Sequence, residues 1–307
     1  METTKNPAKK HVRNKVRLSL GDRIYKAIVF TFVTLFGLVC FYPILSVVMY
    51  SVIPYVDYIR APLNIIPKSL DWSAYEQLLK FDLLYSGYKN SIFITLVGTI
   101  INISLMCLSA YPLSKPDLKG RNVVLGFITV TMFFNGGMIP NYALIRSMGL
   151  LNSLWALIIP GVLSAYNLIL MKNFISQIPA SLEESAYIDG ANEFQILFRI
   201  IIPVSMPAIA TFIIFYAVGQ WNSYFSAVLY TTKRELWTLM LVLREMVVED
   251  SMSLAYQGVI MYEDMTRAAN FTMKMAIIVL ATAPIICIYP FLQRFFTKGI
   301  MVGSVKG

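Results

Sequence analysis

The chain has 307 residues, of which 57% are hydrophobic and only 14% are charged, and its mean hydropathy is +0.63. This composition excludes an ordinary soluble protein and predicts a polytopic membrane protein. The net charge of +9 does not indicate a nucleic-acid-binding protein, because most of it lies in one short segment before the first apolar run.

That basic segment, residues 1–26, carries eight cations and two carboxylates. Such a segment directly before an apolar run is typical of the cytoplasmic side of a membrane protein, so we expect a cytoplasmic N-terminal tail. A cleaved signal peptide is not expected, because the apolar run is too long and no Ala-x-Ala site follows it. His11 is the only histidine of the chain, which argues against a zinc site or a histidine relay.

Six runs without charged residues follow, each long enough for the roughly 20 helical residues that cross a bilayer core. They are residues 27–56, 91–114, 122–145, 147–171, 200–232 and 275–293. The runs lack the alternation of a membrane β-barrel, and helices satisfy their own backbone hydrogen bonds. The predicted fold is therefore an all-α polytopic membrane protein with six transmembrane helices, in one domain over residues 27–296. Residues 297–307 would then form a cytoplasmic C-terminal tail.

Two polar segments between the runs are expected outside the membrane on the opposite side. In residues 57–90, Ser73 and Glu76 form a capping-box pattern that opens a short helix ending near Phe81. In residues 233–271, apolar side chains recur at helical spacing. These are Leu236, Leu239, Met240, Leu243 and Met246. The helix that they predict either packs against neighbouring helix ends or binds an extracytoplasmic partner.

The third run is interrupted near its outer end. Gly136, Gly137 and Pro140 disfavour a continuous helix there. The break is either a tight turn into the outer loop or part of a pore lining.

The polar segment between the fourth and fifth runs is predicted to form two short helices with a hinge. Ser181 would cap the first helix, with Glu184 reaching back to it. Gly190 would end that helix, because glycine readily adopts the left-handed conformation. Asn192 and Gln195 repeat the capping pattern and open the second helix. Glu184 acts either as a cap or as an exposed docking contact.

The same segment resembles the cytoplasmic "EAA" loop of ABC importer permeases. Its usual form is Glu-Ala-Ala, three residues, Gly, nine residues and Ile-x-Leu-Pro. The matching residues here are Glu184-Ser185-Ala186, Gly190 and Ile200-x-Ile202-Pro203, which differ at Ser185 and Ile202. Asp189-Gly190-Ala191, Phe198 and Pro207 are similar to the carbohydrate-importing, maltose-type branch. The C-terminal tail resembles that of the second maltose-type permease subunit, and residues 110–114, 132–134 and 221–222 resemble LplC/YtcP-like permeases for complex oligosaccharides.

The resemblance implies a permease subunit of the bacterial cytoplasmic membrane, with both termini cytoplasmic. Its implied partners are a second permease subunit, two ATPase subunits and an extracytoplasmic solute-binding protein. Residues 179–202 would be the coupling loop, seated in a cleft of the ATPase, whose closure would move the fourth and fifth spans. The implied contact residues are Glu184, Ser185, Ala186, Asp189, Gly190, Ala191, Phe194, Phe198 and Pro203, with Lys306 of the tail. No Gly-x-x-x-x-Gly-Lys-Ser/Thr sequence is present, so we expect ATP hydrolysis on the partner and no cofactor on this chain.

Neutral polar and aromatic residues near the apolar runs are the candidates for the solute path. Sugar hydroxyls need hydrogen bonds, and sugar C–H faces stack on rings. The candidates are Asn102, Asn135, Asn167, Gln220, Trp221, Asn222 and Tyr224. Hydrogen bonding between helices is the alternative role for each of them.

Most span centres lack ionisable residues, which argues against an ion or proton path and favours a neutral or weakly charged solute. A carbohydrate is the leading prediction, and a peptide or an amino acid carried by the same architecture is the alternative. A membrane enzyme is disfavoured because the sequence contains no catalytic constellation. A secondary carrier is disfavoured because the sequence shows no pair of repeat halves.

Overall fold

The computed structural model describes residues 19–60, 69–256, 271–288 and 290, and all regular structure in these ranges is helical. His11, Lys306 and most of both predicted tails lie outside the described residues. Three described helices are long and apolar enough to cross a membrane singly. They are α1 (Leu20–Tyr50), α4 (Asp82–Ser114) and the last helix, Phe271–Ile288. The prediction of an all-helical membrane protein is confirmed for the described residues.

Three further apolar segments are bent helix pairs, and the count of spans rises to as many as six if each pair is one span. The first pair, α5 (Arg121–Phe133) and α6 (Met138–Ser147), turns by 118°. Gly137 lies in the break with φ +84°, and its N–H donates to Oδ1 of Asn135 at 2.9 Å. The predicted interruption of the third run is therefore confirmed, and it takes the form of a sharp turn.

The other two pairs bend less. The second joins α7 (Trp155–Ile158) and the 3-10 turn η1 (Ile159–Gly161) to α8 (Ala165–Ile175), with a bend of 53°. The third joins the arm Glu193–Val204 to α12 (Met206–Trp221), with a bend of 82°. Prolines lie beside both breaks, and a proline lacks the N–H that a continuous helix would use.

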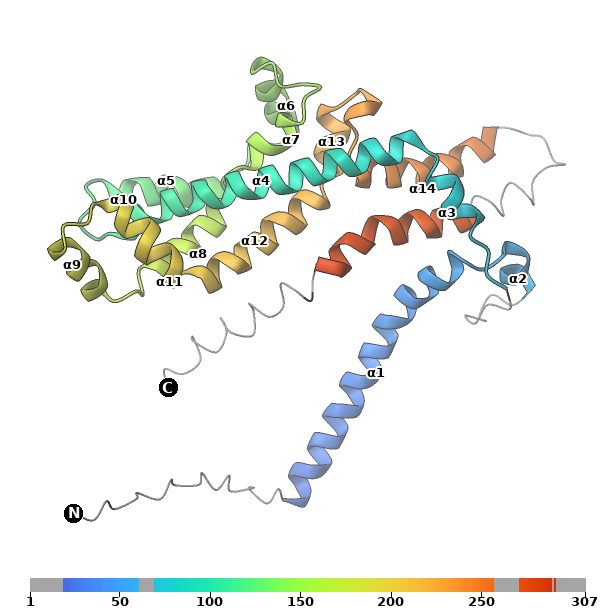
Figure 1. Cartoon of the computed structure of the whole chain (residues 1–307), viewed down its shortest axis with the longest axis horizontal. Coiled ribbons are helices and arrows are strands. Elements are labelled where there is room, and N and C mark those ends of the chain that lie inside the picture. Colours follow the sequence, from blue (N-terminus) through green and yellow to red (C-terminus); the bar gives the residue numbers. More distant parts are fainter. Residues whose placement is uncertain (1–18, 61–68, 257–270, 289, 291–307) are drawn as a thin grey trace, which may run out of the picture.

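The long helix α4 is the axis of the packed body, and the other helices lie along it (Figure 1). It packs against α12 and α8 over much of its length, and against α14 (Leu239–Tyr256) near its N-terminal end. Three buried clusters follow it from end to end. Each contains at least one residue of α4, and we name the clusters after Leu84, Ile94 and Met106.

Short helices complete the end of the body where α4 begins. These are α2 (Tyr55–Arg60), α3 (Ser73–Leu78), α13 (Phe225–Tyr230) and the 3-10 turn η3 (Arg234–Leu236). The predicted capping box of α3 is wrong: its N-cap residue is Trp72, which makes no side-chain cap bond. The backbone N–H of Ser73 is instead taken by Oδ1 of Asp71 at 2.9 Å, and the helix ends at Leu78 rather than near Phe81.

The amphipathic helix predicted in residues 233–271 is present as α14. Leu239 is fully buried, and Met240, Leu243 and Met246 pack against the same cluster as Leu84. Leu236 precedes the helix, in η3. The described part of α14 therefore favours the packing role.

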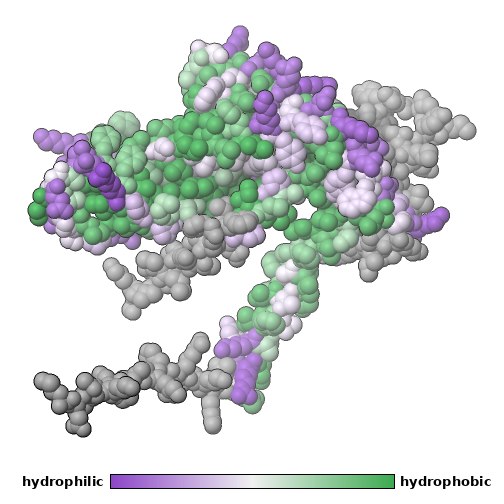
Figure 2. Space-filling model, viewed as in Figure 1, coloured by the Kyte–Doolittle hydropathy of each residue, from purple (hydrophilic) through white to green (hydrophobic). Residues whose placement is uncertain are grey.

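Helix α1 stands away from the body and has no buried residue (Figure 1). Its surface is apolar for most of its length, as is the side of the body around α4 (Figure 2). Hydrophilic residues gather at the two ends of the body instead, one of which carries α9 (Ala180–Ile188) and α10 (Glu193–Ile196). This distribution is the one expected of a protein whose middle faces lipid and whose ends face water.

Candidate functional site

The segment that resembles the EAA loop forms two short helices with a glycine turn between them. Helix α9 ends where Gly190 has φ +82°, and the Gly190 N–H donates to the carbonyl of Tyr187 at 3.0 Å. Helix α10 opens with a capping box between Asn192 and Gln195, whose two hydrogen bonds are both 2.9 Å. A π-helical turn, η2 (Leu197–Ile201), and the short α11 (Ile202–Val204) lead on to α12. The predicted hinge and second cap are confirmed.

The predicted cap of the first helix is wrong. Helix α9 begins at Ala180, two residues earlier than a cap at Ser181 would place it, and its N-cap residue is Pro179, which makes no side-chain cap bond. Ser181 lies inside the helix, and its carbonyl accepts a hydrogen bond of 2.8 Å from Oγ of Ser185. The side chain of Glu184 is exposed and makes no hydrogen bond or ion pair with the described residues. Its capping role is therefore excluded in this structure.

Most of the residues expected at an ATPase contact lie on the surface. Glu184, Ser185, Asp189, Gly190 and Pro203 are exposed, and Ala191 is half-buried. Phe194 and Phe198 are large apolar side chains that remain 68% and 56% exposed. Ala186 is the exception, because it is buried among the residues of the Met106 cluster. The expected small-residue surface is thus formed by Ser185 without Ala186.

A polar network ties these two helices to the end of α4, and no pattern in the sequence indicates it. The Glu193 carboxylate accepts a hydrogen bond of 2.7 Å from the hydroxyl of Tyr111 and one of 2.5 Å from that of Tyr187. Beside it, Lys115 forms an ion pair with Glu183. The Lys115 ammonium also lies over the Tyr111 ring, 4.6 Å from its centroid.

These contacts shift the pKa values of two groups in the network. The hydrogen bond to Glu193, with burial and the charge of Glu193, raises the pKa of the Tyr187 hydroxyl. Burial lowers the pKa of the Lys115 ammonium, and the negative charge of Glu193 opposes that change. The Tyr187 hydroxyl is therefore held as a neutral donor to the carboxylate of Glu193, which is the stronger kind of hydrogen bond.

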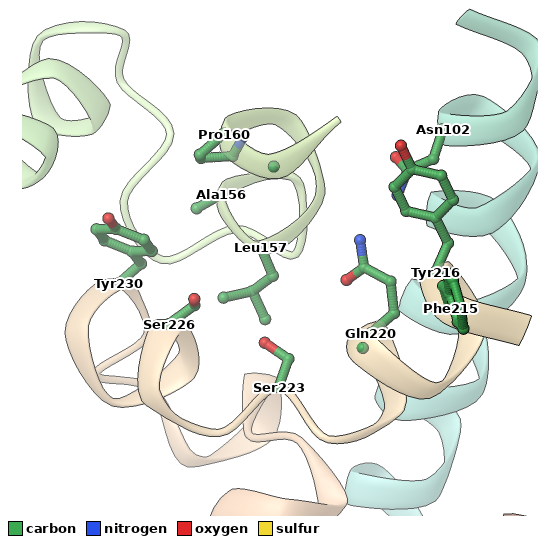
Figure 3. A pocket seen from close by; sticks show the side chains of 12 residues that line it. Asn102, Ala156, Leu157, Pro160, Phe215, Tyr216, Gln220, Ser223, Ser226 and Tyr230 are labelled. Carbon is green, nitrogen blue, oxygen red and sulfur yellow. The ribbon is translucent and has the colours of Figure 1, made fainter. Parts of the chain in front are cut away.

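A cavity of about 390 Å³ lies in the body between α4, α7, α12 and α13 (Figure 3). Its volume is within the usual range for small-molecule sites. The lining residues carry amide, hydroxyl, aromatic and aliphatic groups, and none of them is ionisable as an acid or a base near neutral pH. They are Asn102, Ala156, Leu157, Pro160, Gly161, Phe215, Tyr216, Gly219, Gln220, Ser223, Ser226 and Tyr230.

Two of the predicted solute-path residues, Asn102 and Gln220, meet at this cavity. Asn102 is buried, and its amide nitrogen is assigned to the side that faces the carbonyl oxygens of Gly98 and Val162, at 2.9 and 3.1 Å. The Gln220 side chain crosses α4 at Gly98, where an added Cβ would lie 3.0 Å from its Nε2. The Tyr216 hydroxyl is buried without a hydrogen-bond partner among the described residues.

The other five predicted solute-path residues do not line the cavity. Trp221 is buried on another face of α12, where its Nε1 donates to the carbonyl of Ala281 at 3.1 Å, so it has the interhelical role. Asn222 and Tyr224 are exposed at the end of α12, and Asn167 is half-buried on α8. Asn135 shapes the turn between α5 and α6. Ser223, Ser226, Tyr216 and Tyr230 were missed, although their polar groups within an apolar run were a signal.

Comparison with known proteins places this architecture in a family. Residues 15–302 match the family described as "Binding-protein-dependent transport system inner membrane component". The chain belongs to this family. The permease is therefore a transport subunit of an ATP-binding-cassette importer and is not itself an enzyme.

Relatives of known name agree with this membership. The permease is 40% identical over 294 residues to the polygalacturonan/rhamnogalacturonan transport system permease protein YtcP of Bacillus subtilis (strain 168), covering 94% of this chain and all of the relative. It is 41% identical over 271 residues to protein LplC of the same organism, covering 88% and 91% of the two chains. A chain in the crystal structure of a bacterial ABC transporter involved in the import of the acidic polysaccharide alginate is 33% identical and superimposes with a TM-score of 0.81. That match covers 91% of this permease and 99% of the other chain.

Proposed function

We propose that this permease carries an oligosaccharide across the membrane, through a pathway that it forms with a second permease subunit. Two ATPase subunits drive the cycle, and an extracytoplasmic binding protein delivers the solute. The observation that carries the choice of solute is the cavity beside α4 and α12, whose polar lining consists of amides and hydroxyls. Such groups hydrogen-bond sugar hydroxyls, and the rings of Phe215, Tyr216 and Tyr230 offer faces for sugar C–H groups.

The same lining disfavours a peptide or an amino acid. Unlike a saccharide of neutral or uronic-acid units, a peptide or an amino acid carries an ammonium group, which loses its hydration in the cavity and needs a carboxylate to replace it. No lining residue of the cavity supplies such a charge. The relatives named for polygalacturonan, rhamnogalacturonan and alginate all act on saccharides, which supports the same class here.

For the topology, we propose that each bent helix pair makes one crossing, so that six spans place both termini in the cytoplasm. The basic N-terminal segment supports this orientation. Residues 179–202 then lie on the cytoplasmic side as the coupling loop. Glu184 and the exposed rings of Phe194 and Phe198 form the contact with the ATPase, which Lys306 reaches from the tail.

Helix α1 supports the proposed second permease. It is a span whose apolar side chains are not covered by the described part of this chain, so lipid and a neighbouring subunit are what it can pack against. Contact with a subunit would bury part of that surface without burying a charge, because residues 27–56 have none.

Transport by the complete complex tests the proposal. The permease is reconstituted in liposomes with its second permease, ATPase pair and binding protein, and uptake of labelled oligogalacturonides, arabino-oligosaccharides and tripeptides is measured. We expect ATP-dependent uptake of at least one oligosaccharide, and no tripeptide uptake. Uptake of the tripeptides without any oligosaccharide would overturn the proposed solute class.

A further inference from the structure

The carboxylate of Glu193 joins three elements at the proposed cytoplasmic end of the permease. It belongs to α10, and its two oxygens accept hydrogen bonds from Tyr111 of α4 and Tyr187 of α9. Each oxygen accepts from one phenol, so α9 is linked to α4 by two hydrogen bonds one after the other, through Glu193. Loss of either bond breaks this link. No other described carboxylate is shared by two tyrosine hydroxyls.

A second connection runs beside the first. Lys115, the residue that follows the last turn of α4, pairs with Glu183 of α9. Its ammonium also lies over the Tyr111 ring, which keeps the two connections in contact. Helix α9 is thus tied to the end of α4 in parallel by a hydrogen-bond chain and by an ion pair.

From this end, α4 leads directly to the cavity. Tyr111 follows Asn102 by nine residues on one helix, which is about 14 Å at 1.5 Å per residue. Residues 102–111 contain neither glycine nor proline, and α4 is continuous from the cavity to the network, although Pro112 leaves the carbonyl of Leu108 without its helical N–H donor. The covalent route from α10 to the cavity differs, because it passes through a π-helical turn and the 82° bend before α12.

We propose that Glu193 is a positioning residue for transport, which transmits displacement of α9 to α4 and so reshapes the cavity from its α4 wall. The proposal rests on the proposed function of residues 179–202 as the coupling loop. ATPase closure then acts on the cavity from two sides, through α12 by chain connection and through α4 by the Glu193 contacts. The second side adds α4 to the fourth and fifth spans, which the coupling loop is expected to move.

A reporter that needs no solute tests the transmission. Cys40, Cys107 and Cys287 are replaced by alanine, and Ser223→Cys places one thiol at the cavity. Its rate of reaction with a membrane-impermeant maleimide is measured in the full complex, without nucleotide and after trapping with ATP and vanadate. We expect the two states to differ in rate, and Tyr111→Phe to reduce that ratio by about fivefold or more.

Combined substitutions separate transmission from simple loss of stability. Tyr111→Phe, Tyr187→Phe and the double variant should give equal losses, because the two hydrogen bonds act in series. Lys115→Met added to Tyr111→Phe should deepen the loss, because it breaks the parallel connection. Glu193→Gln can keep both contacts, because its amide oxygen accepts from one phenol and its amide N–H donates to the oxygen of the other, so it should retain more of the ratio than Glu193→Ala. Tyr166→Phe on α8, where the ring is 58% exposed, is the matched control and should leave the ratio unchanged.

Two outcomes would overturn the proposal. One is a wild-type ratio in both Tyr111→Phe and Glu193→Ala, and the other is a loss in the double tyrosine variant that equals the sum of the single losses. Failure of the proposed solute class is distinguishable, because the wild-type labelling ratio would persist while oligosaccharide uptake is absent. Failure of the coupling loop itself would abolish the ratio in the wild type.

Discussion

At the scale of single residues, the wall of the cavity depends on a glycine. Gly98 lies on α4 where the Gln220 side chain crosses, and an added Cβ would approach Nε2, Cδ and Cγ of Gln220 to 3.0, 3.2 and 3.4 Å. Gln220 can move because it is a flexible side chain, but it then leaves the position in which it lines the cavity. Gly98 therefore sets the position of Gln220 in the wall of the cavity.

We expect Gly98→Ala to raise the KM for oligosaccharide uptake by roughly tenfold, the usual size of an effect from one displaced hydrogen bond. The maximal rate should change less, because the helices themselves are not disturbed. Initial uptake rates in the reconstituted complex give both values. Gly126→Ala on α5 is the control, since open space surrounds its added Cβ. An unchanged KM in Gly98→Ala would contradict the role of Gln220.

The surface residue Glu184 permits a charge test of the docking contact. Because it makes no bond that holds α9 together, its replacement should not unfold the helix. We expect Glu184→Lys to reduce co-purification of the ATPase much more strongly than Glu184→Gln, because it reverses a charge rather than removing one. Equal co-purification of both variants at the wild-type level would contradict a contact at Glu184.

At the scale of elements, the hinge between α9 and α10 can be removed by one substitution. Proline cannot adopt the φ of +82° found at Gly190, and it lacks the N–H that donates to Tyr187. We expect Gly190→Pro to abolish transport and weaken ATPase co-purification while membrane insertion, measured by membrane fractionation, stays normal. Solute-stimulated ATPase activity at the wild-type level in this variant would contradict the coupling role.

Trp221 allows a test of the contact between α12 and the last helix. Its Nε1 donates to the carbonyl of Ala281, so it joins α12 to the last helix and does not face the cavity. We expect Trp221→Phe to lower the thermal stability of the purified complex, by about 1 kcal/mol for the lost hydrogen bond, with the uptake KM unchanged. Trp72→Phe is the control, because that ring is 55% exposed. A raised KM at normal stability would instead show that Trp221 contacts the solute.

These elements also show what the sequence could predict. The capping box of Asn192 and Gln195 and the left-handed Gly190 depend on neighbouring residues, so a local pattern was sufficient. The start of α9 was misplaced by two residues, because Ser181 is the residue type that usually caps a helix, whereas the helix here extends back to Pro179. Gln220 and Trp221 are adjacent on α12 and face different ways, and only the packing of other helices determines which one lines a cavity. The contact between Glu193 and Tyr111 joins residues 82 positions apart, beyond any local pattern.

At the scale of the whole molecule, α1 distinguishes a subunit from a self-contained protein. Phe36 near its middle is 63% exposed, whereas Phe212 in the body is 5% exposed. We expect a photo-crosslinking amino acid at position 36 to form adducts with the second permease and with lipid, and one at position 212 to form adducts within this chain. Mass spectrometry of the irradiated complex identifies them. Adducts of position 36 only with residues 82–221 would contradict the unpartnered position of α1.

The isolation of α1 has a consequence for how cells make this permease. In a permease that has not yet bound its partner subunit, α1 is an apolar helix with few contacts to the rest of its own chain. Such a helix is open to cleavage by membrane proteases and to association with the wrong protein. Surplus copies would be cleared rather than stored. Under the proposed pairing with a second permease, we expect the two subunits to be made in matched amounts, because the exposed surface of α1 needs a partner.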